Sequence, residues 1–302
     1  MLSAATIDPF WACLPYPFER RFTVGKFAAM QTIRMARGYF GRELLPVFCY
    51  LVGDTLVDTG LACYGDELAE LVRTSGAHRA VITHHHEDHA GNAARLQNEG
   101  LEVLSSAGTA ALVCQDMPIH LYQHIVWGKM PPAQTSIFGE RIRIGPYLAD
   151  VIPAPGHCPD QVVFHVPEEG WLFSGDAFLS ERVQLFRRDE DFAATVATLE
   201  RLLRLDFDAL LCAHRPRFTG GWSSLAAKLQ WLRDIEGEVR RYHARGLPTR
   251  DIAKRVLRPP QLRMLITAYD ASAENMVRSI LFGPTPRPWP LPGAAPARPS
   301  AG

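Results

Sequence analysis

The stretch that decides the fold is THHHEDHAGN, residues 83–92. The four residues before it, RAVI, form an apolar run that predicts a short buried strand. In an extended continuation of that strand, alternate side chains point the same way, so His84, His86 and Asp88 share one side. We expect His89 to begin a helix whose first turn brings its ring back to the same space. Clustered imidazoles and a carboxylate at this spacing are typical of a metal site, whereas a histidine tag would lie at a terminus.

Four further motifs accompany this stretch. LVDTG carries Asp58, PGH carries His157, FSGD carries Asp176 and LCAH carries His214. Together the five motifs resemble the metallo-β-lactamase superfamily, and within it the glyoxalase II-like hydrolases, over residues 45 to 218. The resemblance implies an α+β fold, a four-layer αββα sandwich with a helical extension at its C-terminal end. Periodicity by itself indicates only mixed α and β structure.

The candidate ligands offer nitrogen and oxygen atoms without a thiolate, which suits zinc, with iron or manganese as alternatives. Seven such residues exceed the needs of one tetrahedral ion, so we expect two divalent ions. The resemblance implies a first ion on His84, His86 and His157, a second on Asp88, His89 and His214, and a bridging Asp176. It also implies that Asp58, and with it Thr83, steadies the histidine loop, with plain turn capping as the alternative for Asp58.

Two ions about 3.5 to 4 Å apart can share a water and lower its pKa toward about 7. The leading hypothesis is a metal-dependent hydrolase in which this bridging hydroxide attacks a small ester, thioester or lactone, while Asp88 orients the nucleophile or relays its proton. The alternatives are a phosphodiesterase or ribonuclease on the same centre, a mono-iron sulfur dioxygenase, and a binding protein that retains the metal. Because Asp176 stands where many zinc β-lactamases have cysteine, the resemblance disfavours antibiotic hydrolysis. The basic motif expected for glutathione thioesters is not found.

Composition limits the other functions. The 302 residues carry a net charge of zero, which gives no general attraction to nucleic acid or membranes. The first 21 residues lack the basic start and apolar block of a signal peptide, so we expect a cytoplasmic protein that acts on a small molecule. The six cysteines have no C-x-x-C spacing and are read as reduced thiols. The oligomeric state is not indicated.

Changes in composition and pattern along the chain predict three segments. Residues 1–221 form the catalytic domain, residues 222–283 a helical appendage and residues 284–302 a disordered, Pro/Ala-rich tail. Between Ser223 and Phe282 the appendage carries eleven basic and six acidic residues, which suit an anionic substrate tail, nucleic acid or simply a solvated face. The irregular stretch 115–139 is either a lid over the metals or a surface excursion. Its side chains proposed for a substrate pocket are His120, His124 and Trp127.

Overall fold

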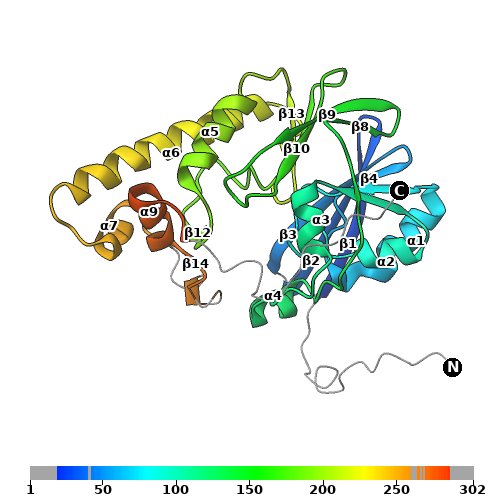
Figure 1. Cartoon of the computed structure of the whole chain (residues 1–302), viewed down its shortest axis with the longest axis horizontal. Coiled ribbons are helices and arrows are strands. Elements are labelled where there is room, and N and C mark those ends of the chain that lie inside the picture. The colour runs from blue at the N-terminus through cyan, green and yellow to red at the C-terminus, as the bar shows by residue number, and fades with distance from the viewer. Residues whose placement is uncertain (1–18, 40–41, 260–263, 266, 268, 286–302) are drawn as a thin grey trace, which may run out of the picture.

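Two β-sheets form the centre of the computed structural model, which describes residues 19–39, 42–259, 264–265, 267 and 269–285 (Figure 1). The first sheet has seven strands in the spatial order β1-β2-β3-β4-β5-β6-β7. Their bounds are β1 Glu19–Phe27, β2 Met30–Tyr39, β3 Arg42–Val52, β4 Thr55–Val57, β5 Arg79–Val81, β6 Glu102–Ser105 and β7 Ser136–Ile137. Strands β1 to β4 pair antiparallel, whereas β4 to β7 run parallel.

The second sheet has five strands in the order β13-β11-β10-β9-β8. They are β8 Arg141–Ile144, β9 Tyr147–Pro153, β10 Val162–Val166, β11 Trp171–Gly175 and β13 Ala209–Cys212. Strand β10 pairs antiparallel with β9 and β11, and β13 runs parallel to β11. Because β9, β11 and β13 therefore point the same way, the segments that follow them meet at one edge of the sheet.

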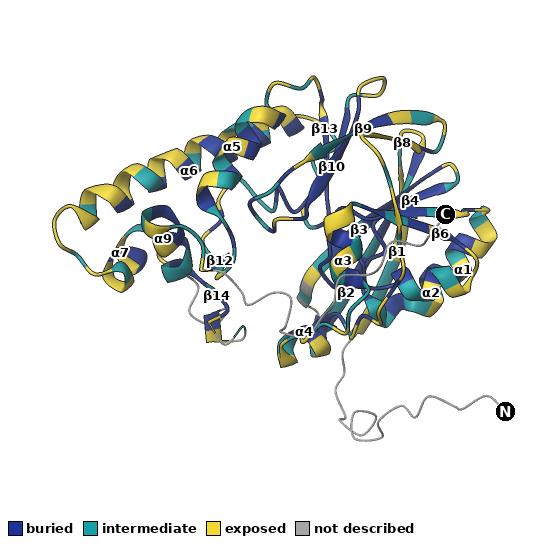
Figure 2. Ribbon diagram, viewed as in Figure 1, coloured by how far each residue is buried: buried dark blue, intermediate teal, exposed yellow. Residues whose placement is uncertain are grey.

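Helices cover the outer face of each sheet. On the first sheet lie the short η1 Ala62–Tyr64 and the helices α1 Gly65–Ser75, α2 Ala93–Asn98 and α3 Ala107–Val113, with α4 Leu121–Val126 beyond them. On the second lie α5 Phe192–Leu202 and the long α6 Gly221–His243, followed by α7 Thr249–Val256 and α9 Ala273–Phe282. Figure 2 shows the strands between these helix layers as mostly buried, while the outer faces of α6 and α7 are exposed.

Alternation along the strands explains the layering. On β3, Cys49 and Leu51 belong to the apolar cluster shared with α1 and α2, whereas Tyr50 and Val52 belong to the cluster between the sheets. On the second sheet Phe164 faces the other sheet in the same way, while neighbouring side chains pack on α5 and α6. Strands buried on both faces read as continuous apolar runs, because successive side chains enter different cores. The predicted four-layer αββα sandwich with C-terminal helices is confirmed.

Three local predictions were wrong. The sequence of residues 22–34 by itself predicts a strand, but the chain turns at Ala28, whose φ is +48°, and forms the β1–β2 hairpin. His89 does not begin a helix, because residues 88–92 are turns and α2 begins at Ala93. The sequence of residues 259–282 by itself predicts one helix, but β14 Ala271–Ser272 interrupts it, pairs with β12 Phe186–Arg187 and ties the appendage to the core.

The domain limits remain predictions. Helix α6 begins at Gly221, close to the predicted boundary. Its Leu225, Leu229 and Leu232 pack in the same apolar cluster as α5 and β13, so this part of the appendage lies directly on the sandwich. Residues 286–302, most of the expected disordered tail, lie outside the described residues, as do residues 1–18. Within the described part of the chain, no helix combines the length and apolarity needed to cross a bilayer.

Candidate metal centre

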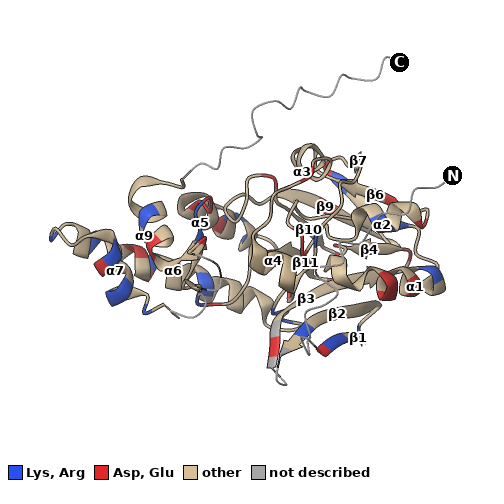
Figure 3. Ribbon diagram, turned by 90° about the horizontal axis from the view of Figure 1, so that it is seen from below, with Lys and Arg blue, Asp and Glu red and all other residues tan. Residues whose placement is uncertain are grey.

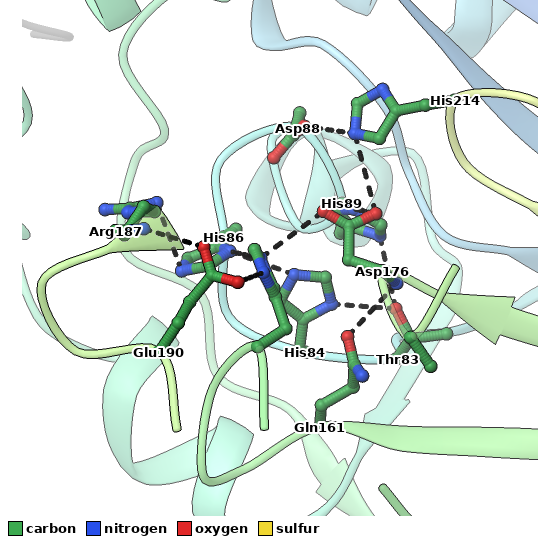
Figure 4. Close-up of polar contacts among 12 residues, drawn as sticks. Thr83, His84, His86, Asp88, His89, Gln161, Asp176, Arg187, Glu190 and His214 are labelled. Atoms are coloured by element: carbon green, nitrogen blue, oxygen red, sulfur yellow. Dashed lines mark hydrogen bonds and ion pairs between the residues drawn. The ribbon is translucent and has the colours of Figure 1, made fainter. Parts of the chain in front are cut away.

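The motif residues come together at the edge where strands end. Asp58 follows β4, the histidine-rich stretch follows β5, His157 follows β9, Asp176 follows β11 and His214 follows β13. Parallel strands end at the same edge of a sheet, so short segments far apart in sequence converge there. Figure 4 shows this convergence.

Three histidines form the first group. The Nδ1 atom of His86 lies 3.0 Å from Nε2 of His84 and 3.0 Å from Nε2 of His157. These three nitrogen atoms could hold one metal ion. Zinc binds imidazole nitrogen at about 2.0–2.1 Å, which places two such ligands roughly 3.3 Å apart. The observed spacing is close to that requirement.

The second group lies beside the first and contains Asp88, His89, Asp176 and His214, whose ligand atoms are all within 4.8 Å of one another. Nε2 of His214 lies 3.4 Å from an oxygen of Asp88. Nε2 of His89 lies 3.3 Å from Oδ1 of Asp176. All seven predicted ligands are therefore brought into two adjacent groups.

Asp176 stands between the groups. Its Oδ2 lies 3.3 Å from Nε2 of His157, whereas its Oδ1 lies 3.3 Å from Nε2 of His89 and 3.5 Å from Nε2 of His214. The backbone amide of Asp176 donates to Oε1 of Gln161 at 3.1 Å, which fixes the loop. Oδ1 of Asp176 and Nε2 of His89 are buried, and among the described residues they make ion-pair contacts but no well-formed hydrogen bond. Such atoms are costly unless something binds them, and a cation would do so.

Hydrogen bonds fix the histidine rings from behind. Asp58 accepts from the backbone amide of Thr83 at 2.8 Å and from its hydroxyl at 3.0 Å, and one of its oxygens lies 2.8 Å from Nδ1 of His89. The Thr83 hydroxyl also lies 3.1 Å from Nδ1 of His84. Nδ1 of His214 lies 3.0 Å from the carbonyl oxygen of Pro46. Partners of this kind orient rings and leave the opposite nitrogen to face the cluster.

Burial and charge set the protonation of the cluster. Burial lowers the pKa of His84 and His86 well below the usual value, and the charge of His89 on the first and of Arg187 on the second adds to this. Both rings are therefore neutral and can offer a nitrogen lone pair to a metal. Burial also acts to lower the pKa of His89, but nearby carboxylates, Asp58 first, raise it well above the usual value. Conversely, burial would raise the pKa of Asp176, and the neighbouring histidines outweigh it and lower that pKa. His89 and Asp176 thus each favour the charged form of the other.

His85 pairs with Asp160 and belongs to neither of the two groups above. Its Nδ1 lies 2.8 Å from Oδ1 of Asp160, and its backbone amide donates to the same carboxylate at 3.0 Å. Thr109 donates to Asp160 at 2.8 Å. Cys158, next to His157, is buried, and burial followed by Asp160 raises its pKa well above the usual value. It is therefore a protonated thiol, although its sulfur lies near His85 and His86.

Sequence reasoning missed two charged residues at the cluster, Arg187 and Glu190. Nη1 of Arg187 lies 3.3 Å from Nε2 of His86, and its Nε lies 3.5 Å from Asp270. Glu190 accepts from the backbone amide of Arg187 at 2.8 Å and lies 3.5 Å from Nδ1 of His157. The segment FRRDE that carries both residues has no periodicity or motif, so nothing in it signalled this position.

The irregular stretch 115–139 lies partly beside the cluster, because Gln123 on α4 donates to Glu87 of the histidine-rich stretch. His120 lies 3.6 Å from Asp270, the partner of Arg187. Trp127, however, is buried in the apolar cluster of the first sheet, and His124 is exposed on α4. The substrate-pocket role of these residues stays a prediction.

One buried cation reaches the centre from the appendage. Lys228 on α6 is 4% exposed and donates from Nζ to the carbonyl oxygen of Ala177 at 2.7 Å. Burial lowers its pKa to about 8, against the attraction of Glu190 and Asp176. Because Ala177 follows Asp176 directly, this contact joins α6 to the loop that carries Asp176.

Comparisons with known proteins agree with this geometry. The family model described as metallo-beta-lactamase superfamily matches residues 42–214. A hydroxyacylglutathione hydrolase of Rhodobacter capsulatus is 30% identical over 151 residues, which cover 46% of this chain and 52% of that protein. The chain thus spans about half the length of the curated relatives it matches.

Solved structures share the fold. A beta-lactamase domain protein from Burkholderia ambifaria superposes with a TM-score of 0.64 at 18% identity, covering 85% of this chain and 87% of that one. A metallo-beta-lactamase from Pontibacter korlensis gives a TM-score of 0.56 at 22% identity, covering 71% of this chain and all of that one. At these identities the likeness concerns the fold alone.

Proposed function

Because this chain belongs to the metallo-beta-lactamase superfamily, we propose that it is a dinuclear metal hydrolase of a small ester, thioester or lactone. The observation that carries the proposal is the position of Asp176, whose two oxygens face two different groups of imidazoles. A carboxylate placed in this way suits a shared ligand. The curated relatives named hydroxyacylglutathione hydrolase favour thioesters within this class.

The residues fit two divalent ions, zinc first, with iron or manganese as alternatives. His84, His86 and His157 would hold one ion, Asp88, His89 and His214 the other, and Asp176 both. When bound, such a pair supplies an activated water near neutral pH and polarises the substrate's oxygen. Asp58 and Thr83 would keep the rings of His84 and His89 in place.

The protein's own groups would complete the reaction. Asp88 is buried at the centre, and its pKa is lowered because the charges of His89 and His214 outweigh burial, so it is an ionised acceptor for a proton. Arg187 adds a buried positive charge beside His86, where negative charge on the substrate would be stabilised. Neither step needs a serine or cysteine nucleophile.

The test is metal analysis of the purified protein coupled to a panel of thioesters, lactones and phosphodiesters. The proposal expects two ions per chain and turnover of a thioester or lactone that chelation abolishes and zinc restores. Turnover of phosphodiesters alone would replace the proposal with a phosphodiesterase. One iron per chain with oxygen uptake on a persulfide would replace it with a sulfur dioxygenase, and bound metal without turnover with a binding protein.

A further inference from the structure

A cavity lies in the C-terminal helices, between α7, β14 and α9. Its volume is about 530 Å³, within the range of small-molecule sites. Four cations line it, namely Arg188, Arg250, Lys254 and Arg278, together with the ring of Tyr269. Glu274 is the one acid among the described residues of its wall, and its carboxylate already accepts from Thr249 at 2.7 Å. Figure 3 shows basic segments on α7 and α9.

These four cations differ from the basic residues of α6. Arg233, Arg240 and Arg241 each pair with a glutamate at 2.7 to 3.0 Å. Within the described part of the chain, no ion pair joins Arg188, Arg250, Lys254 or Arg278 to an acid. Arg250 and Lys254 are four residues apart on α7, so they share one face of that helix. Like charges gathered from three elements repel one another unless an anion joins them.

The cavity and the metal centre lie at two sides of the β12–β14 ribbon. Arg187 reaches His86, whereas the next residue, Arg188, lines the cavity. In the partner segment, Asp270 lies against Arg187 while Tyr269 lines the cavity. In each of the two segments, neighbouring residues thus face different sites. The cavity is therefore a site apart from the metal ligands.

The position of Tyr269 adds an aromatic surface to these charges. Its backbone has φ +62°, a conformation that costs an L-residue about 1 kcal/mol or more and that collects at functional sites. Its amide donates to Met264 at 2.8 Å, and its side chain is 49% exposed. Guanidinium groups match phosphate oxygens in bidentate geometry, and an exposed ring can stack on a base.

We propose that this cavity binds a small nucleotide through its phosphate groups. Two phosphates match four cations better than one carboxylate does, and the volume of the cavity suits one small molecule rather than a strand. Binding does not depend on the proposed hydrolysis, because the residues involved are not metal ligands. It is expected to weaken as salt rises, since the cations are exposed.

The test is calorimetric titration of the metal-loaded protein with ADP at low salt, with adenosine, citrate and a short oligothymidylate as comparison probes. ADP should bind once per chain, and adenosine and citrate at least roughly ten-fold more weakly. The double variant Arg250→Ala/Lys254→Ala should weaken ADP binding by a similar factor. The matched control Arg233→Ala/Arg241→Ala removes the same charge from exposed paired positions and should leave it unchanged.

A further titration separates the cavity from the metals. The Asp176→Ala variant should bind ADP as the unaltered protein does, because the cavity does not include this residue. No saturable binding of ADP, or equal loss in the control variant, overturns the proposal. Tighter binding of oligothymidylate that is lost with Arg250 and Lys254 assigns a nucleic-acid surface instead, and citrate binding as tight as ADP removes the phosphate preference.

Discussion

The metal centre and the basic cavity both gather charge, but they differ in how it is compensated. At the centre, the ligand atoms of the carboxylates and imidazoles lie within 4.8 Å of one another inside each group, and their charges offset each other. In the cavity, four exposed cations meet one acid that is already hydrogen bonded. The difference indicates that the centre is held in place by its own contacts before a ligand arrives, whereas the cavity depends on its ligand for compensation.

The largest expected effect comes from removing the carboxylate of Asp176, which lies between the two groups. Asp176→Ala should abolish metal binding and activity together while the fold is kept. The loss of activity should exceed the roughly 10–100-fold that is typical when a residue hydrogen-bonded to a metal ligand is changed. Metal content, turnover and circular dichroism on the same samples measure this. The control Asp150→Ala removes an acid from a surface pair with Arg141 and should change none of them. Full metal occupancy with unchanged turnover in Asp176→Ala would refute the shared-ligand assignment.

A pair of glycines compares how tightly the metal loop and helix α6 are packed. In the metal loop, a Cβ at Gly91 would run into the carbonyl oxygens of Gly60 and Glu87. Gly91→Ala should therefore destabilise the protein by about 2–4 kcal/mol. Gly237 on α6 meets nothing within 4 Å, so Gly237→Ala should stabilise by up to about 1 kcal/mol through helix propensity. Urea denaturation measures both, and similar values for the two variants would contradict the close packing of the loop.

Lys228 joins α6 to the loop that follows Asp176 and gives a pH dependence. Its pKa falls from the usual 10.5 to about 8 in the folded protein, because burial disfavours the charged form. The unfolded chain therefore binds more protons between these values, and stability should rise with pH across the window from about 8 to 10.5. Relative to Lys228→Met, the gain should be roughly 3 kcal/mol. Denaturation at several pH values measures it, and parallel profiles for the two proteins would show that Lys228 has no shifted pKa.

The contacts behind the rings give a smaller effect. Asp58→Asn keeps the size of the side chain but weakens its pairing with His89 Nδ1. Metal affinity should fall roughly 10–100-fold with the fold retained. Competition with a chelator measures the affinity, and an unchanged value would leave Asp58 the turn-capping role, which its φ of +58° also suits.

Most of the candidate metal centre could be predicted from the sequence, because its candidate ligands lie in short motifs at strand ends. Four of the seven lie within residues 84–89, and the other three each follow a strand that apolar runs indicated. The same motifs predicted the superfamily and the layered fold, and both predictions are confirmed. His85, which the alternation assigns to the other side of the stretch, pairs with Asp160 and belongs to neither group.

What the sequence could not predict depends on contacts between distant segments. Arg187 and Asp270 meet because a two-residue ribbon pairs β12 with β14, and neither strand is long enough to show alternation. The four cations of the cavity come from three elements, so a count of basic residues in the appendage gave their excess but not their meeting place. The turn at residues 88–92 escaped because the local pattern fits a helix start equally well.

The most direct test of the whole account is titration of the chelated protein with zinc while bound metal and thioester hydrolysis are followed together. The account predicts that two equivalents bind per chain, that turnover depends on them, and that Asp176→Ala shows neither. Full turnover in protein that holds no metal, or binding that stops at one ion with full activity, would contradict it.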